Sequence, residues 1–158
     1  MAYSLAMTLW RPASGICVKA LGLHWRGSRL LAAEVPDAAG RVAGVRPLGG
    51  TVEFGETARA AVVREFREEL GITVTAKSQP MVMENLYVHE GAPGHEVLFL
   101  FEVAFPPGAF DGQSRLSFGE DNGIVCHAAW FDLDALDRPG GPALFPAGLK
   151  ARLARARG

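Results

Sequence analysis

Three glutamates in the middle of the chain are the residues whose type and spacing point most directly to chemistry. Glu65, Glu68 and Glu69 lie in a segment that reads as a helix, capped by Thr57 and running to Leu70. At about 100° per residue, Glu68 falls at about 300° and Glu69 at about 40° when Glu65 is set at zero. All three carboxylates therefore share one face of the expected helix.

Three negative charges on one helix face repel one another. Like charges one turn apart repel by a few tenths of a kcal/mol, and no lysine lies among these glutamates. A bound cation would offset that repulsion, because hard cations prefer oxygen ligands. The alternative is an ordinary solvated surface. Val63, Phe66 and Leu70 form a separate apolar stripe that can face a core.

The wider spacing is more specific than the acidic face alone. The chain reads Gly50, five residues, Glu56, seven residues, and then Arg-Glu-Phe-Arg-Glu-Glu-Leu-Gly-Ile from Arg64 to Ile72. This segment resembles the Nudix box, G-x5-E-x7-R-E-U-x-E-E-x-G-U, where U is a bulky aliphatic or aromatic residue. Every fixed position of the motif matches. At average residue frequencies, a chance match anywhere in the chain is below about one in a million. The chain is therefore similar to the Nudix family.

The resemblance implies a fold and a reaction. Nudix proteins are α+β, with a mixed β-sheet sandwiched between helices in an α/β/α arrangement, and we expect residues 1–158 to form a single domain of this kind. The resemblance also implies a metal-dependent hydrolase that cleaves a diphosphate bond in a nucleoside diphosphate linked to another group X. The substrate classes to consider are ADP-ribose, dinucleoside polyphosphates, nucleotide sugars and nucleoside triphosphates.

The same resemblance assigns the residues of the site position by position. It makes Glu65, Glu68 and Glu69 the ligands of Mg²⁺ or Mn²⁺, with the main-chain carbonyl of Gly50 as an additional ligand. Such cations can bridge a carboxylate cluster to substrate phosphates. Arg64 resembles the family arginine that orients a carboxylate and does not touch substrate. Metal or a carboxylate would activate the attacking water.

The general base is left open between several carboxylates. Family members use a glutamate of the box or of a later loop, so Glu65 is one candidate and Glu120, in the loop before the last strand, is another. An ordinary acidic turn is the alternative for Glu120. Glu96 begins an apolar strand and either points toward the site or lies at a sheet edge, because strand alternation leaves its face undecided. We assign no role to the neighbouring His95.

Two residues are candidates for substrate binding. Arg46 precedes the segment that leads into Gly50, and its guanidinium is suited to bidentate contact with a phosphate. A surface ion pair is the equal alternative for Arg46. Tyr87 lies close to where dinucleoside-polyphosphate members of the family carry a tyrosine. A packing role in a strand is the alternative for Tyr87.

Strands on both sides of the helix must position these residues. Runs of Val, Ile, Leu and Phe between glycines and prolines predict strands, and Thr57 and Gly71 are the expected caps of the first helix. A second, short and basic helix is expected after Pro146. The predicted strands are Ile16 to Leu23, Arg29 to Val35, Arg41 to Arg46, Val74 to Val88 with a break at Pro80, Glu96 to Phe105, and Ile124 to Phe131.

Composition limits the class of protein. The chain has 158 residues, of which 49% are hydrophobic and 21% charged, which suits a globular domain and excludes disorder. A net charge of -1 gives no reason to expect a nucleic-acid partner, and no apolar run approaches the roughly 20 residues of a membrane span. Two cysteines, Cys17 and Cys126, are too few for a disulfide framework and favour a cytoplasmic location.

Other functions compete with the hydrolase. A catalytically silent module that senses a nucleotide or ADP-ribose is the main alternative, but such modules often lose box glutamates, and here none is lost. Isomerisation of a prenyl diphosphate would need a catalytic cysteine, whereas Cys17 and Cys126 lie in strand-like segments that favour packing. A structural or interaction domain is the third alternative. Dimers are frequent in the family, so the resemblance makes a homodimer one candidate assembly, and the expected partner is a small nucleotide diphosphate substrate.

Overall fold

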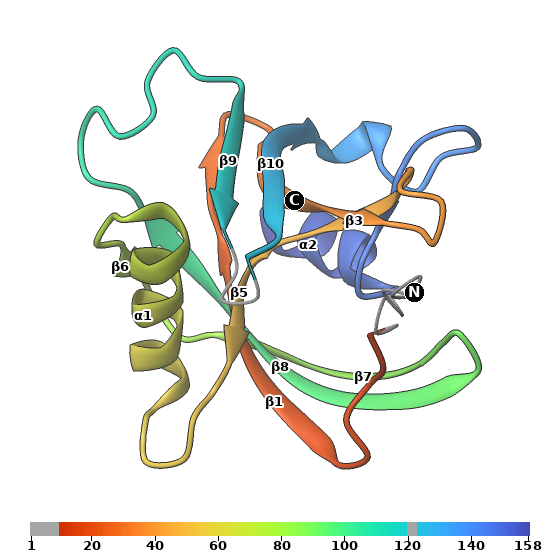
Figure 1. Ribbon diagram of the computed structural model, residues 1–158. Coiled ribbons are helices and arrows are strands. Elements are labelled where there is room, and N and C mark those ends of the chain that lie inside the picture. The colour runs from red at the N-terminus through yellow and green to blue at the C-terminus, as the bar shows by residue number, and fades with distance from the viewer. Residues whose placement is uncertain (1–9, 120–122) are drawn as a thin grey trace, which may run out of the picture.

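Two β-sheets and two α-helices form the part of the chain that the computed structural model describes, residues 10–119 and 123–158 (Figure 1). The first sheet contains β1 Ile16–Leu23, β5 Leu48–Thr51, β6 Thr75–Ala76, β7 Met81–His89 and β8 Ala92–Ala104. The second contains β2 Trp25–Arg26, β3 Arg29–Pro36, β4 Val42–Arg46, β9 Arg115–Gly119, β10 Val125–Asp132 and β11 Ala143–Leu144. The helices are α1 Ala58–Leu70 and α2 Leu149–Arg157, and a 3₁₀ turn covers Leu133–Ala135.

Both sheets are mixed. The first has the strand order β5-β1-β8-β6 with β7 paired to β8, and the second has the order β11-β4-β3-β10-β9 with β2 paired to β3. The β1–β8 and β11–β4 pairs are parallel, and the other pairs are antiparallel. The register of β1 sets Ala20 beside Gly50 of β5 and Cys17 beside Glu96 of β8.

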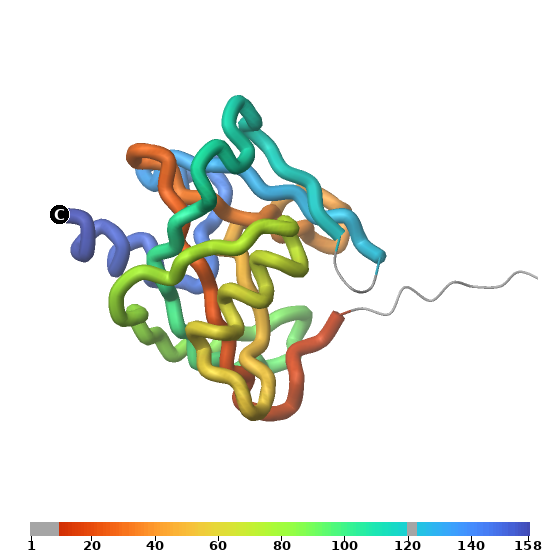
Figure 2. Tube along the Cα trace, turned by 90° about the vertical axis from the view of Figure 1, so that its left-hand side faces the viewer, coloured from red at the N-terminus to blue at the C-terminus, as the bar shows by residue number. Residues whose placement is uncertain are grey.

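The alternation of β1 shows how the layers are built. Ala20 lies in a core cluster with Phe66 of α1, whereas Leu21 lies in a second cluster with Leu149 and Leu153 of α2. Successive side chains of a strand point to opposite faces, so the two helices cover opposite faces of β1. In Figure 2, which views the molecule from the side of α1, the strands lie behind this helix. The predicted α/β/α sandwich of the α+β class is confirmed.

The predicted ends of the first helix are also confirmed. The hydroxyl of Thr57 accepts a hydrogen bond from the Ala60 amide at 3.1 Å, which satisfies one of the free amides of the first turn. At the other end, Gly71 adopts a φ of 69°, and its amide donates to the Arg67 carbonyl. These caps fix where α1 begins and ends, and so fix which way each of its glutamates points.

The strands differ from the prediction in several places. The segment expected as one strand with a break is divided into β6 and β7, and β8 begins at Ala92, before the expected Glu96. The strand β5, which follows β4 after Pro47, was not among the predicted strands, and neither were the short strands β2 and β11. The strand β9 was not predicted, because its short alternation of buried Leu116 and Phe118 gains meaning only from its pairing with β10.

Candidate active site

The acidic face of α1, defined as Glu65, Glu68 and Glu69, lies over the end of β5. The Glu65 carboxylate rests against the backbone of Gly50, where an added Cβ would come within 2.7 Å of Glu65 Oε2 and closer still to Cδ and Oε1. No side chain larger than hydrogen fits between them. Glu68 is exposed, whereas Glu65 and Glu69 are half-buried, and Glu69 Oε2 is a buried oxygen.

Arg64 holds this face together. Its Nη1 donates to Glu65 Oε1 at 2.9 Å and to Glu68 Oε2 at 3.2 Å, while Nη2 donates to the Thr51 carbonyl at 3.0 Å. Nε and Nη2 also donate to the two oxygens of Glu56, at 3.1 and 2.6 Å. The guanidinium thus ties the loop before α1 to two of its three glutamates, which offsets their mutual repulsion.

The pKa values around Arg64 follow from these contacts. The hydrogen bond to Glu56 is the main reason that the pKa of the Arg64 guanidinium is raised, and the Glu65 carboxylate adds to the effect. Conversely, the hydrogen bond from Arg64 lowers the pKa of Glu56, helped by the Glu53 amide, which donates to Glu56 Oε1 at 2.9 Å. Arg64 is therefore committed to carboxylates of its own chain.

The chemistry of the donor set fits a hard divalent cation. Arg64 takes one oxygen of Glu65 and one of Glu68, and each carboxylate has a second oxygen. Gly50 brings main-chain atoms into direct reach of Glu65. Among the described residues, no group of three or more His, Cys, Asp or Glu side chains is already gathered around one point that could hold an ion.

Of the later carboxylates, Glu96 does not join the acidic face. Its side chain is buried and forms an ion pair with Lys19 Nζ at 2.8 Å, and Asn85 Nδ2 donates to its other oxygen at 3.1 Å. Lys19 alternates with Ala20, which faces α1, so Glu96 and Lys19 lie on the opposite face of the sheet. His95, next in the chain, contacts Glu84 at 3.1 Å. Glu120 lies outside the described residues.

Tyr87 lies near this buried ion pair, and the charge of Arg46 acts on its phenol. The Tyr87 ring covers Gly94 across the β7–β8 pair, where a larger residue would collide with it. Burial raises the pKa of the Tyr87 phenol, the Glu96 carboxylate raises it further, and the positive charge of Arg46 opposes the shift. The structure therefore gathers Lys19, Asn85, Tyr87 and Glu96 into one polar face of the first sheet, opposite to the face that α1 covers, whereas Arg46 belongs to β4 of the second sheet.

Sequence reasoning missed Lys19 and Asn85 in this polar sheet face. A lysine inside the apolar strand Ile16–Leu23 is an available signal, because a charge on a buried strand needs a partner. Nothing near Asn85 in the sequence points to Glu96, since their contact depends on the register between β7 and β8.

The family model described as NUDIX domain matches residues 23–150, which is well over half of the chain. The chain belongs to the NUDIX family. The resemblance carried by Gly50 to Ile72 is thereby confirmed, and the prediction of a pyrophosphohydrolase is confirmed at the level of the family.

Solved structures of NUDIX proteins share the fold. A MutT NUDIX hydrolase from Burkholderia pseudomallei is 24% identical, with a TM-score of 0.56 over 87% of this chain and 97% of that one. The E. coli ORF135 protein is 23% identical, with a TM-score of 0.55 over 90% and 91% of the two chains. An ADP-ribose pyrophosphatase from Streptococcus suis is 18% identical, with a TM-score of 0.52 over 87% of each chain. At these identities the likeness shows the fold alone.

No functionally curated protein matches the chain. Within residues 10–119 and 123–158, no helix combines the length and the apolar character that crossing a membrane requires.

Proposed function

We propose that this NUDIX chain is a metal-dependent hydrolase that cleaves a diphosphate bond in a nucleoside diphosphate linked to another group X. The observation that carries the proposal is the contact between Glu65 and Gly50, with Arg64 tying Glu65 and Glu68 to the preceding loop. A complete set of box glutamates is thus presented at one place in the fold. Residues 1–158 form a single domain in this proposal.

The proposed site uses Mg²⁺ or Mn²⁺. Glu65, Glu68, Glu69 and the Gly50 carbonyl would hold the ion, which supplies charge neutralisation of the diphosphate and activation of water. Arg64 positions Glu65 and Glu68 without touching substrate, as its hydrogen bonds support. The role of general base falls to Glu65 or, in the loop outside the described residues, to Glu120.

In this proposal, substrate binding falls to Arg46 and Tyr87. Arg46 makes no side-chain hydrogen bond or ion pair to residues 10–119 or 123–158, so its guanidinium is available for a phosphate. Tyr87, held over Gly94, presents a ring for contact with a nucleoside. Cys17 and Cys126 are half-buried and are not joined by a disulfide, which supports a reducing, cytoplasmic location. A homodimer stays part of the proposal, and sedimentation equilibrium tests it.

The test is product release by the purified protein with Mg²⁺ or Mn²⁺. Substrates are ADP-ribose, dinucleoside polyphosphates, nucleoside triphosphates, nucleotide sugars and NADH, and the substrate turned over fastest identifies X. Glu69→Gln should lower turnover by orders of magnitude and weaken metal binding, with an unchanged circular dichroism spectrum. Glu84→Gln is the matched control, because Glu84 is 64% exposed and lies on β7 away from the acidic face.

Two results would count against the proposal. Equal turnover by Glu69→Gln and the unaltered protein would remove the acidic face from the reaction. Metal binding without turnover of any substrate in the panel would favour the alternative function, a silent module that senses a nucleotide or ADP-ribose.

A further inference from the structure

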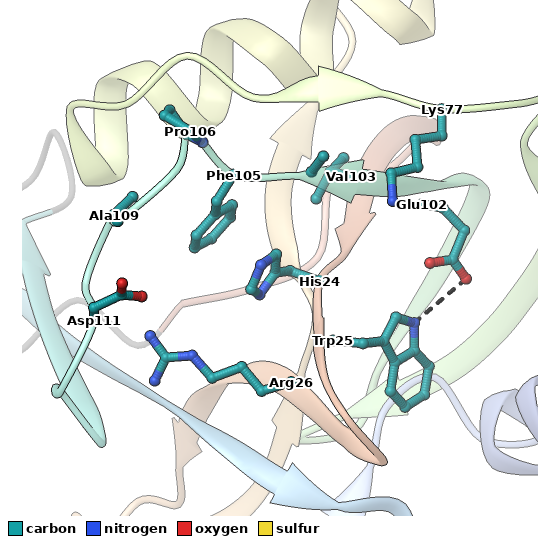
Figure 3. A pocket seen from close by; sticks show the side chains of 12 residues that line it. His24, Trp25, Arg26, Lys77, Glu102, Val103, Phe105, Pro106, Ala109 and Asp111 are labelled. Atoms are coloured by element: carbon teal, nitrogen blue, oxygen red, sulfur yellow. Dashed lines mark hydrogen bonds between the residues drawn. The ribbon is translucent and has the colours of Figure 1, made fainter.

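A cavity of about 380 Å³ lies at the carboxyl end of β1, and we call it the strand-end cavity. His24, Lys77, Glu102 and Asp111 line it from four separate segments of the chain (Figure 3). Its volume falls in the range of small-molecule sites, about 300 to 1,000 Å³.

This cavity is separate from the proposed active site. Gly50, which contacts Glu65, is paired with Ala20 of β1. His24 lies four residues further along the chain, a distance of about 13 Å at about 3.3 Å per residue in an extended strand. A ligand in the strand-end cavity would therefore not contact the acidic face.

One wall of the cavity is fixed by stacked rings. The His24 imidazole lies parallel to the Phe105 ring, with centroids 3.7 Å apart and planes at 16°. Phe105 in turn meets the buried Phe66 of α1 edge-on at 5.9 Å. Trp130 Nε1 donates a hydrogen bond to His24 Nδ1 at 3.1 Å. His24 is thus held in one orientation before any ligand arrives, which lowers the entropic cost of binding.

A second part of the lining is fixed by Arg26. Its Nη1 donates to the Gln113 carbonyl at 2.6 Å and its Nη2 to the Phe110 carbonyl at 2.7 Å. The same guanidinium lies 3.3 Å from the centroid of the Trp130 ring. Arg26 therefore holds in place the loop that carries Asp111, and its own donors are largely used.

His24 offers the cavity a neutral hydrogen-bond donor. Because Nδ1 accepts from Trp130, the proton of the neutral ring lies on Nε2. No residue in 10–119 or 123–158 accepts a hydrogen bond from Nε2. Burial, with the positive charges of Arg26 and then Lys77, lowers the pKa of His24 to about 4, so the ring is uncharged at neutral pH.

Charges of both signs surround this donor. Glu102 is half-buried and accepts a hydrogen bond from the neutral Trp25 indole at 3.3 Å. Neither Lys77 nor Asp111 has a side-chain ion pair with any residue that the structure describes. In Figure 3, Lys77 and Glu102 approach from one side, Asp111 and Arg26 from the other, and His24 lies between.

The balance of charges decides the class of ligand. A simple anion would be repelled by Glu102 and Asp111, and a simple cation by Lys77 and Arg26. A molecule that carries one positive and one negative charge is attracted by both the acidic and the basic side chains. We propose that the strand-end cavity binds a small zwitterion, a free amino acid, with its ammonium on Glu102 and its carboxylate on Lys77 and the His24 Nε2–H.

Indole signals in a ¹H–¹⁵N spectrum of the full chain test this proposal. The Trp25 and Trp130 N–H groups donate to Glu102 and His24, whereas Trp10 meets the His89 ring edge-on with centroids 5.1 Å apart. Titration with the free amino acids should give saturable shifts of the Trp25 and Trp130 signals for at least one of them, and none for Trp10. The absence of a saturable shift with any of them overturns the proposal.

Analogues that lack one charge sharpen the test. For the best amino acid, the N-acetyl form lacks the ammonium and the carboxamide form lacks the carboxylate, and each should bind at least about tenfold more weakly. Equal binding by either form contradicts the two-charge assignment. Glu102→Gln and Lys77→Gln should also weaken binding about tenfold, whereas the exposed Glu90→Gln should not. Since binding is measured and not turnover, the outcome is independent of the proposed hydrolase.

Discussion

The acidic face of α1 and the strand-end cavity concentrate charge in opposite ways. The acidic face takes three carboxylates from five consecutive positions of one helix, Glu65 to Glu69, and a single arginine restrains two of them. The cavity takes its charges from four segments, in both signs, between walls fixed by rings and by Arg26. An excess of one charge suits an exchangeable cation, whereas a balanced set suits a ligand that carries both charges.

The two regions also differ in how they are held. The acidic face depends on one close backbone approach, at Gly50, so a small local change disturbs it. The cavity walls depend on several contacts made by Arg26, His24, Phe105 and Trp130. Loss of one of these contacts should lower the free energy of unfolding more than it lowers the affinity for a ligand. Damage to the acidic face should therefore be seen in the rate of hydrolysis, and damage to the cavity walls in the stability of the fold.

The largest effect is expected from Gly50→Ala. The new Cβ would lie within 2.7 Å of Glu65 Oε2 and push the carboxylate from its place. We expect turnover of the best substrate to fall about 100-fold, the usual cost of a misplacement of about 1 Å in a catalytic group. Gly15→Ala is the control, since nothing lies within 4 Å of its added Cβ. Steady-state kinetics of both variants measures this effect. Equal turnover by Gly50→Ala and Gly15→Ala would show that the position of Glu65 does not affect the reaction.

An intermediate effect, on stability, is expected from Arg26→Lys. Lysine cannot donate to the Gln113 and Phe110 carbonyls together while covering the Trp130 ring. The free energy of unfolding should fall by about 1 to 3 kcal/mol, measured in urea. Arg138→Lys, at an exposed position, should change it by less than about 0.5 kcal/mol. Equal midpoints for the two variants would mean that Arg26 does not hold the loop.

The smallest effect is a change in pH dependence through His24. Its pKa is lowered from 6.5 to about 4 in the folded protein, so between these values the unfolded chain binds more protons. His24 therefore destabilises the fold progressively as pH falls from 6.5 to about 4, and adds nothing further below. Melting temperatures of the unaltered protein should fall more steeply over this window than those of His24→Gln. Parallel curves would contradict the neutral, buried imidazole.

The acidic face could be predicted from the sequence because its geometry is local. A helix fixes the angles between Glu65, Glu68 and Glu69, and Thr57 and Gly71 mark its ends within the same segment. The closeness of Glu65 to Gly50 could also be predicted from the sequence, because the motif includes both residues. The family and the layers of the fold followed from the same short stretch.

The polar sheet face and the strand-end cavity could not be predicted, because strand registers create them. Glu96 meets Lys19 and Asn85 only through the β1–β8 and β7–β8 pairs, and the sequence left its face undecided. His24 and Trp130 are far apart in the chain, and neither carries a motif. A hydrogen bond between them follows from the complete fold and from no pattern along the chain.

β1 serves every region described above, and this limits how the gene can change. Along this strand Ala20 lies beside Gly50, Lys19 pairs with Glu96, Leu21 joins the core under α2, and the chain then enters the cavity at His24. Insertion or deletion of one codon in β1 would exchange its two faces and disturb all of these at once. Descendants of this sequence are therefore expected to vary in length at turns such as 37–41, and to keep the length of β1.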